Sequence, residues 1–288
     1  MVAKEQPKPK PLSTNVYPWA TFYRRQGRDF DADLASSLAE VKKSGADHFE
    51  PNLKSLDFVD TLSDELEKQG IGMISVYVNS ELYEREKARE SIDWVMSIVR
   101  KAKKRMGTQI VVTNPSPIRW GGPENKNDEQ LEIQRDALEE LGKAIHGEGM
   151  SLAYHFHDPE FREGAREVHH MLAATDPRYV KTCLDAHWAF RGAGDSNVAL
   201  HDVVKLYGDR IVELHIRQSQ GGVWTEAFGE GDIDYSRLTR ELVDLGISPL
   251  VTMEQAVEAK TPNTMDALEA HIISHAKGRE VFAPFVSS

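Results

Sequence analysis

The sequence has 288 residues, of which 40% are hydrophobic and 28% charged, and its formal net charge is −11. This length allows one large α/β domain or two small ones. The acidic balance argues against nucleic acid or an anionic membrane surface as a partner, and no apolar run approaches the roughly 20 residues that a membrane-spanning helix needs.

The chain begins with a polar, proline-rich stretch, MVAKEQPKPKPLSTN. We interpret residues 1–13 as a flexible leader and residues 14–288 as a single domain. The leader lacks the apolar stretch of a secretory signal, so the cytoplasm is the expected compartment, with the periplasm as the alternative if an export signal was removed. The one cysteine, Cys183, excludes an intrachain disulfide and is predicted to be a small buried side chain in a strand.

Short apolar or β-branched runs alternate with longer segments of helical spacing along the rest of the chain. The predicted strands lie near Val16–Ala20, Asp47–Glu50, Gly72–Val78, Gln109–Thr113, Ser151–Phe156, Val180–Asp185, Ile211–Ile216 and Pro249–Glu254. The predicted helices lie within residues 31–45, 55–70, 89–107, 127–149, 197–210, 234–246 and 264–279. Several of these segments end on glycine, which is a common helix stop signal.

Eight strand–helix units in a chain of this size predict a single (β/α)₈ TIM barrel. A doubly wound open sheet gives the same alternation and is the alternative. No G-x-G-x-x-G motif follows the first predicted strand, which weakens a dinucleotide-binding interpretation. In a barrel, the catalytic groups stand at the carboxyl ends of the strands, so the residues that end the eight runs identify the candidate site.

Five of the eight predicted strands end on an Asp, Glu or His. The strand ends carry Glu50, Asn114, His155 with His157, Asp185 with His187, His215 with Arg217, and Glu254. A single buried histidine is more often a hydrogen-bonded core group than a ligand. Four such groups on four successive strands favour a metal site instead. Mixed imidazole and carboxylate ligands suit Mn²⁺, Zn²⁺, Co²⁺ or Fe²⁺.

The motifs around these strand ends resemble those of the xylose isomerase-like TIM barrel superfamily, which includes sugar isomerases, sugar epimerases and inosose dehydratases. The motifs are AYHFHDPEF, LDAHWAFRGAGD, RIVELHIR followed by FGEGDIDYSRL, and TMEQ, and the resemblance runs from about Gly45 to Glu254. It implies a divalent metal, with Mn²⁺ expected first and Zn²⁺, Co²⁺ or Mg²⁺ as alternatives. It also implies that the chain can form a homodimer.

The resemblance implies Asp185, His215 and Glu254 as metal ligands on strands 6, 7 and 8. The strand-5 ligand departs from the family pattern, because His155 stands where the epimerases carry a glutamate. A histidine can bind the metal but does not readily repeat the proton transfer of a carboxylate. The side chain two residues along a strand faces the same way, so His157 is the expected second acid/base beside His155.

The candidate catalytic residues are therefore His155, His157 and Glu254. They suit an isomerase or epimerase that removes a proton next to a keto-sugar carbonyl. They equally suit a lyase, which eliminates a leaving group from an inosose or a 3-keto-glycoside. An endonuclease IV-like hydrolase and a non-catalytic sugar-binding barrel are weaker alternatives, because the first needs a basic DNA groove and the second would be expected to lose a ligand.

The expected substrate is a small sugar or a cyclic polyol ketone without a phosphate, since no basic cluster accompanies the two glycine-containing loops. The candidate substrate-binding residues are Glu50, Asn114, His187, Trp188 and Arg217. Aromatic side chains near strand ends can stack on sugar rings. The candidates are Trp19, Tyr77, Trp120, Trp188, Trp224 and Phe228, of which we expect at most two to do so.

Overall fold

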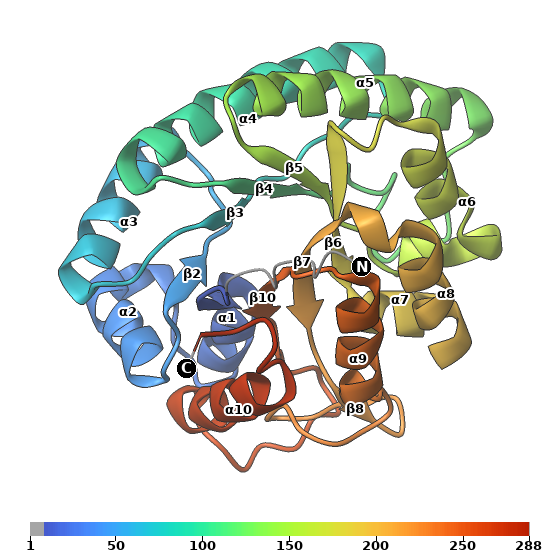
Figure 1. The fold of residues 1–288 in the computed structure, drawn as a ribbon. Helices are drawn as coiled ribbons and strands as arrows, with labels where there is room; N and C mark the ends of the chain where they lie inside the picture. The colour runs from blue at the N-terminus through green and yellow to red at the C-terminus, as the bar shows by residue number, and fades with distance from the viewer. Residues whose placement is uncertain (1–8, 288) are drawn as a thin grey trace, which may run out of the picture.

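The computed structural model describes residues 9–287. Its main sheet has eight parallel strands in the order β2-β1-β10-β7-β6-β5-β4-β3. The strands are β1 (Leu12–Asn15), β2 (His48–Glu50), β3 (Ser75–Tyr77), β4 (Ile110–Thr113), β5 (Ser151–Tyr154), β6 (Val180–Asp185), β7 (Ile211–Ile216) and β10 (Leu250–Met253). Figure 1 shows this sheet curving around a centre with helices outside it.

Strands β2 and β3 close the sheet into a barrel. Two parallel bridges join them, His48 to Gly72 and Asn52 to Tyr77. The Phe49 amide donates to the Gly72 carbonyl at 2.9 Å, and the Gly72 amide donates to the Asp47 carbonyl at 3.0 Å. Gly72 permits this approach, because a Cβ there would lie 2.3 Å from the His48 ring. The predicted (β/α)₈ barrel is confirmed.

The outer ring consists of helices whose ends follow from local sequence. They are α1 (Val16–Arg25), α2 (Leu34–Lys43), α3 (Leu56–Gln69), α4 (Arg85–Met106), α5 (Asp128–Gly147), α6 (Asp158–Ala174), α7 (Ala186–Gly192), α8 (Asn197–Tyr207), α9 (Tyr235–Leu245) and α10 (Ala267–Val281). Short 3₁₀ helices lie at η1 (Asp31–Asp33) and η2 (Gly208–Arg210). In α3, the Ser55 hydroxyl caps the first turn, and Gly70 at φ 62° ends the helix in the left-handed region.

The first predicted strand is wrong. The segment Val16–Ala20 is the first half of helix α1, and strand β1 precedes it at Leu12–Asn15. The Asn15 side chain caps this helix by accepting from the Tyr17 amide at 2.6 Å, and proline is tolerated in a first helical turn, where Pro18 lies. Leu12 and Ser13, which we assigned to the leader, therefore belong to the barrel. Residues 1–8 of that leader lie outside the described residues.

Helix α6, helix α7 and a small hairpin were not among the predicted elements. Helix α6 begins at Asp158, with three residues between it and β5, and is interrupted by non-helical backbone at residues 162–165. The loop after β7 contains a small antiparallel hairpin of β8 (Ser219–Gln220) and β9 (Val223–Trp224). The structure contains no helix between residues 9 and 287 that is long and apolar enough to cross a membrane.

The apolar core has two parts. The larger one lies between the sheet and the helices, and a smaller cluster includes Val112, Ala153, Cys183 and Leu250, from strands β4, β5, β6 and β10. Cys183 is fully buried, as predicted.

Candidate metal centre and adjoining cavity

Four neighbouring strands bring the predicted ligands together. His155 directly follows β5, Asp185 ends β6, His215 lies in β7 and Glu254 directly follows β10. The β6–β7 register sets Asp185 opposite His215, and the Glu254 amide continues the next ladder by donating to the Ile216 carbonyl at 2.9 Å. One potential ligand atom from each of the four side chains lies within 4.8 Å of the others.

The atoms of this quartet fit a cation. His155 Nε2, Asp185 Oδ2 and Glu254 Oε2 are buried and accept or donate no hydrogen bond among the described residues. The same is true of both ring nitrogens of His215. His215 and Glu254 have ion-pair partners in Glu50 and Arg217, but buried polar atoms normally make hydrogen bonds, so a cluster that makes none suits a shared partner. Two imidazoles and two carboxylates are a donor set that suits Mn²⁺, Zn²⁺, Co²⁺ or Fe²⁺.

Glu50 lies behind His215 and does not line the cavity formed by the described residues. It is fully buried, and its Oε2 lies 3.0 Å from His215 Nε2 and 2.5 Å from Asn15 Nδ2. This position directs His215 Nδ1 toward Glu254 Oε2, 3.3 Å away. Its strand points the carboxylate into the barrel toward His215, so the expected contact between Glu50 and substrate stays a prediction. Its place matches that of a carboxylate that orients a metal-binding histidine.

A second buried carboxylate lies next to Glu50. The Ser75 hydroxyl is 2.9 Å from Glu50 Oε1 and 2.7 Å from Glu213 Oε2. Burial and the charge of Glu50 raise the pKa of Glu213. A protonated Glu213 can donate to Ser75, which lets the single hydroxyl proton serve Glu50. Two more ligand clusters, Glu50–Glu213–His215 and His155–Cys183–His215, overlap the quartet at His215.

Arg217 supplies the positive charge beside the quartet. Its side chain is buried, and Nη2 lies 3.0 Å from Glu254 Oε2 and 4.0 Å from Asp185 Oδ2. The guanidinium lies 4.2 Å from the centre of the Trp224 ring and 5.2 Å from that of Trp188. Burial raises the pKa of Glu254, but Arg217 and His215 outweigh this effect and lower it to about 2. Glu254 is thus an ionised carboxylate near neutral pH.

His157 lies beside the quartet. Its ring centre is 4.6 Å from that of His155, and the rings of Trp120 and Trp188 lie 4.9 and 5.5 Å away. Burial and the neighbouring His155 hold the pKa of His157 well below its usual value, so the imidazole is neutral. Glu160 fixes the backbone here, because its Oε2 accepts from the His157 amide at 2.6 Å.

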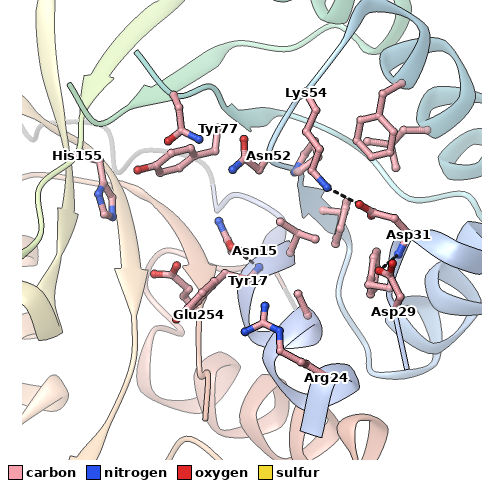
Figure 2. Close-up of a pocket in the computed structure, with 18 of the residues that line it drawn as sticks. Asn15, Tyr17, Arg24, Asp29, Asp31, Asn52, Lys54, Tyr77, His155 and Glu254 are labelled. Carbon is pink, nitrogen blue, oxygen red and sulfur yellow. Dashed lines mark hydrogen bonds and ion pairs between the residues drawn. The ribbon is translucent and has the colours of Figure 1, made fainter. Parts of the chain in front are cut away.

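A cavity of about 580 Å³ opens above the quartet. Of the predicted site residues, those that line it are His155, His157, Trp188, Arg217 and Glu254. Asp185 and His215 are not among its described lining residues and are fully buried. Figure 2 shows His155 and Glu254 on one side of this cavity, with Tyr77, Asn52 and Asn15 between them and the opposite side.

Two other residues expected to contact substrate, His187 and Asn114, are not among the described residues that line the cavity, and their role in binding stays a prediction. Strand β6 ends at Asp185, which caps helix α7, so His187 follows helical geometry and is buried against Phe190 and Trp224. Burial and Arg217 lower the pKa of His187 to about 3. Asn114 is also buried, and its Nδ2 donates to the His155 carbonyl at 3.1 Å. It supports the strand-5 ligand.

The sequence analysis missed several polar residues of the cavity. Asn15, Tyr17 and Asn52 line it; Asn15 ends strand β1, Tyr17 lies just after it, and Asn52 lies just after β2. The misplaced first strand concealed Asn15 and Tyr17. Of the six aromatic candidates, Tyr77, Trp120 and Trp188 line the cavity, and the expectation that at most two stack on a sugar ring stays a prediction. Trp19 and Phe228 are core residues.

Comparison with known proteins gives one family. A family model described as "Xylose isomerase-like TIM barrel" matches residues 38–272. Among curated proteins, the chain is similar to an inosose dehydratase of Bacillus velezensis, with 25% identity over 158 residues, which is 49% of this chain and 52% of that protein. The chain therefore matches about half the length of this curated relative.

Two solved structures share the fold over nearly the whole chain. One is described as IOLI protein with a bound zinc atom, with a TM-score of 0.70, 19% identity, and coverage of 97% of this chain and 100% of that one. The other is the 3-keto-D-glucoside 4-epimerase YcjR of E. coli in its apo form, with a TM-score of 0.67, 16% identity, and coverage of 94% and 99%.

Proposed function

The chain belongs to the xylose isomerase-like TIM barrel family, and from this we propose that it is a divalent-metal-dependent enzyme that moves a proton at the carbon next to the carbonyl of a keto-sugar, as an isomerase or epimerase does. One observation carries the proposal. Two imidazoles and two carboxylates with unpaired buried atoms converge at the carboxyl ends of four neighbouring strands, at the floor of a cavity. Relatives named as epimerases and as inosose dehydratase support the same chemistry.

In this proposal, His155, Asp185, His215 and Glu254 hold the metal. When bound, the metal polarises a substrate carbonyl and so makes the neighbouring C–H more acidic. We propose Mn²⁺ as the resident ion, with Zn²⁺, Co²⁺ and Mg²⁺ as alternatives. The mixed donor set and the zinc reported for a structural relative support a divalent cation.

The chain's own side chains move the proton. Glu254 is ionised and lines the cavity, so it can accept a proton from carbon on its side of the substrate. His157 is neutral, lines the cavity and lies beside His155, so it can accept or return a proton on the other side. Arg217 and Trp188 also line the cavity, and we propose that they position the sugar.

A lyase is the second candidate, and the strand-5 position favours it. His155 stands where the epimerases carry a glutamate, so the pair of opposed carboxylates is incomplete. A base on one side and an imidazole acid near the leaving group suit β-elimination. The curated relative named inosose dehydratase supports this alternative.

The test is the metal content of the purified protein, followed by proton NMR in D₂O with ketohexoses, 3-keto-glucosides and inososes after Mn²⁺ is restored. We expect deuterium to enter the carbon next to the carbonyl. Exchange without loss of a group identifies an isomerase or epimerase, whereas an alkene signal with release of water or an alcohol identifies a lyase. No bound metal and no exchange with any ketone would refute both.

The partner of this site is a small sugar or a cyclic polyol ketone. The net charge of −11 opposes nucleic acid as a substrate. A homodimer and a cytoplasmic location stay predictions, which sedimentation and cell fractionation can test.

A further inference from the structure

The cavity extends well beyond the candidate metal centre. Its described lining runs from His155 and Glu254 to residues of α1, η1, α2 and α3 on the opposite side. Figure 2 shows Asp29, Asp31 and Lys54 at this far side. A volume of about 580 Å³ falls within the range that encloses drug-sized ligands, and it leaves room for a group attached to a single sugar ring.

The far part of the cavity, which we name the apolar lobe, is chemically unlike the metal side. Its walls are Phe30, Leu34, Phe49, Phe58 and Leu62. The rings of Phe30 and Phe49 stack with centres 5.6 Å apart and planes inclined by 11°. Phe30, Phe49 and Leu62 are part of the buried core, while Leu34 and Phe58 are partly buried and pack against it. The accessible apolar surface of this wall comes mainly from Leu34 and Phe58, and the buried Phe30, Phe49 and Leu62 pack behind it.

Charged side chains at the rim of the apolar lobe do not form an anion site. Arg24 and Lys54 are matched by Asp29 and Asp31, so the four formal charges cancel. Lys54 is already bound to Asp31 in an ion pair. Arg24 has no ion-pair partner among the described residues, but a single cation offers less than the cluster of charged donors that usually binds a phosphate. The lobe is therefore suited to an uncharged group that gains by leaving water.

Between the two parts of the cavity lie the polar side chains of Asn15, Asn52 and Tyr77. Asn15 is already bonded to Glu50 and to the Tyr17 amide, so Asn52 and Tyr77 are the groups that a sugar ring can bond through its hydroxyl groups. The cavity is thus polar next to the candidate metal centre and apolar beyond it. This order matches a ligand with a sugar at one end and an apolar ring at the other.

From this arrangement we infer that the natural substrate is a keto-glycoside with an aromatic aglycone, whose sugar lies at the metal centre and whose ring enters the apolar lobe. The inference rests on the proposed function for the identity of the sugar end. It adds a second binding site, formed by Phe30, Leu34, Phe49, Phe58 and Leu62, that selects the group attached to the sugar. Burying a phenyl ring there favours binding in proportion to the apolar area removed from water.

The experiment compares pairs of ligands by calorimetry with the full, Mn²⁺-loaded protein. Phenyl and methyl 3-keto-glucosides form one pair, and the unoxidised phenyl and methyl β-glucosides form the other. We expect each phenyl ligand to bind roughly 10- to 100-fold more tightly than its methyl partner. A ketohexose 6-phosphate is included as the anionic competitor, and we expect it to bind more weakly than the phenyl ketone.

Two variants test whether the preference for phenyl over methyl ligands arises in the apolar lobe. Leu34→Trp fills the lobe and should abolish the phenyl preference, while methyl ligands bind as before. Leu34→Asn keeps the size of the side chain but makes the wall polar, and should reduce the preference even if the tryptophan variant does not fold. Val198→Trp is the control, because Val198 is 71% exposed on α8 and is not among the described residues that line the cavity.

The outcomes separate this inference from the proposed function. Deuterium exchange of the methyl 3-keto-glucoside reports on the metal centre alone, whereas the phenyl preference within the unoxidised pair reports on the lobe alone. Equal affinities in both pairs, or tighter binding of the sugar phosphate than of the phenyl ketone, would overturn the inference. So would a phenyl preference that both Leu34 variants leave unchanged.

Discussion

The two ends of the cavity are built from different parts of the barrel. The metal end stands on the carboxyl ends of β5, β6, β7 and β10, where neighbouring strands fix the ligand atoms within 4.8 Å. The apolar lobe is formed mainly by side chains from α2, α3, β2 and the loop before η1. Strand ends give the precise spacing that catalysis needs, whereas helix surfaces give apolar area that can vary without disturbing it.

The two ends also differ in how their groups are held. Each predicted ligand is backed by other buried groups, as Glu50 backs His215 and Asn114 supports the backbone of His155. The lobe needs only packed side chains. We therefore expect changes at the metal end to alter metal binding and turnover while the preference for a phenyl group persists, and the following variants test this separation.

The largest effect is expected from Asp185→Asn. The amide still caps α7, because Asp185 Oδ1 accepts from the Trp188 amide at 2.8 Å and an amide oxygen can do the same. It removes the charge that binds the metal, so we expect loss of bound metal and of about 10³-fold or more in turnover. Elemental analysis and NMR turnover measure both. Asp202→Asn on the exposed face of α8 is the control, and full metal content in Asp185→Asn would remove the proposed centre.

Next comes His157→Ala. His157 lines the cavity but is not part of the quartet, so the metal should stay bound. Turnover should fall roughly 10²- to 10⁴-fold, as expected for loss of a general acid or base. The control is His170→Ala, which changes a half-buried histidine of α6 that lies 3.6 Å from Glu132. A near-normal rate would show that another group moves the proton.

A smaller effect is expected from Glu50→Gln. Without the carboxylate at 3.0 Å, the ring of His215 loses the partner that orients it. Metal affinity should fall about 10- to 100-fold, with the phenyl preference unchanged. Competition with a chelator measures the affinity, and Glu81→Gln on an exposed loop is the control. Unchanged affinity would assign the orientation of His215 to other contacts.

The smallest effect on turnover is expected from Glu160→Gln, which instead changes the pH dependence of stability. Burial and the nearby Glu167 raise the pKa of Glu160 from 4.5 to about 7. The folded state therefore holds this proton more tightly than the unfolded state does. The contribution of this proton to the free energy of unfolding is therefore fully present below pH 4.5 and is lost as the pH rises through 7.

Between these pH values, the free energy of unfolding of the wild type should fall on the order of 2 to 3 kcal/mol relative to Glu160→Gln. Urea denaturation of both proteins at several pH values measures this difference. The amide oxygen introduced by this substitution can still accept from the His157 backbone amide, so turnover should change little. Parallel pH curves for the two proteins would contradict the assignment.

Much of the metal end could be predicted from the chain alone. His155, Asp185, His215 and Glu254 each stand at the end of a β-branched or apolar run, and parallel strands bring such ends to one edge. The prediction that His157 faces the same way as His155 also agrees with the structure, since both line the cavity. The alternation of eight short apolar runs with helical segments was sufficient to predict the barrel fold.

The failures have three separate causes. Alternation gives the direction of a side chain only while the strand lasts, and β6 ends at Asp185, so His187 follows a helix and turns away from the cavity. The predicted first strand failed because Val16–Ala20 has strand-like residues, yet Asn15 caps a helix at that point. Glu50 is at a predicted strand end, but only the closed barrel shows that it lies beneath His215.

The sequence by itself determined the periodic elements, the strand ends and the kinds of chemical groups that meet there, because these depend on local spacing and on the rule that parallel strands share an edge. Only the tertiary structure decided which of those groups line the cavity and which support others from behind. The apolar lobe also exists only in the tertiary structure. Phe30, Leu34, Phe49, Phe58 and Leu62 come from separate segments, and no local pattern distinguishes an apolar side chain that lines a cavity from one that fills the core.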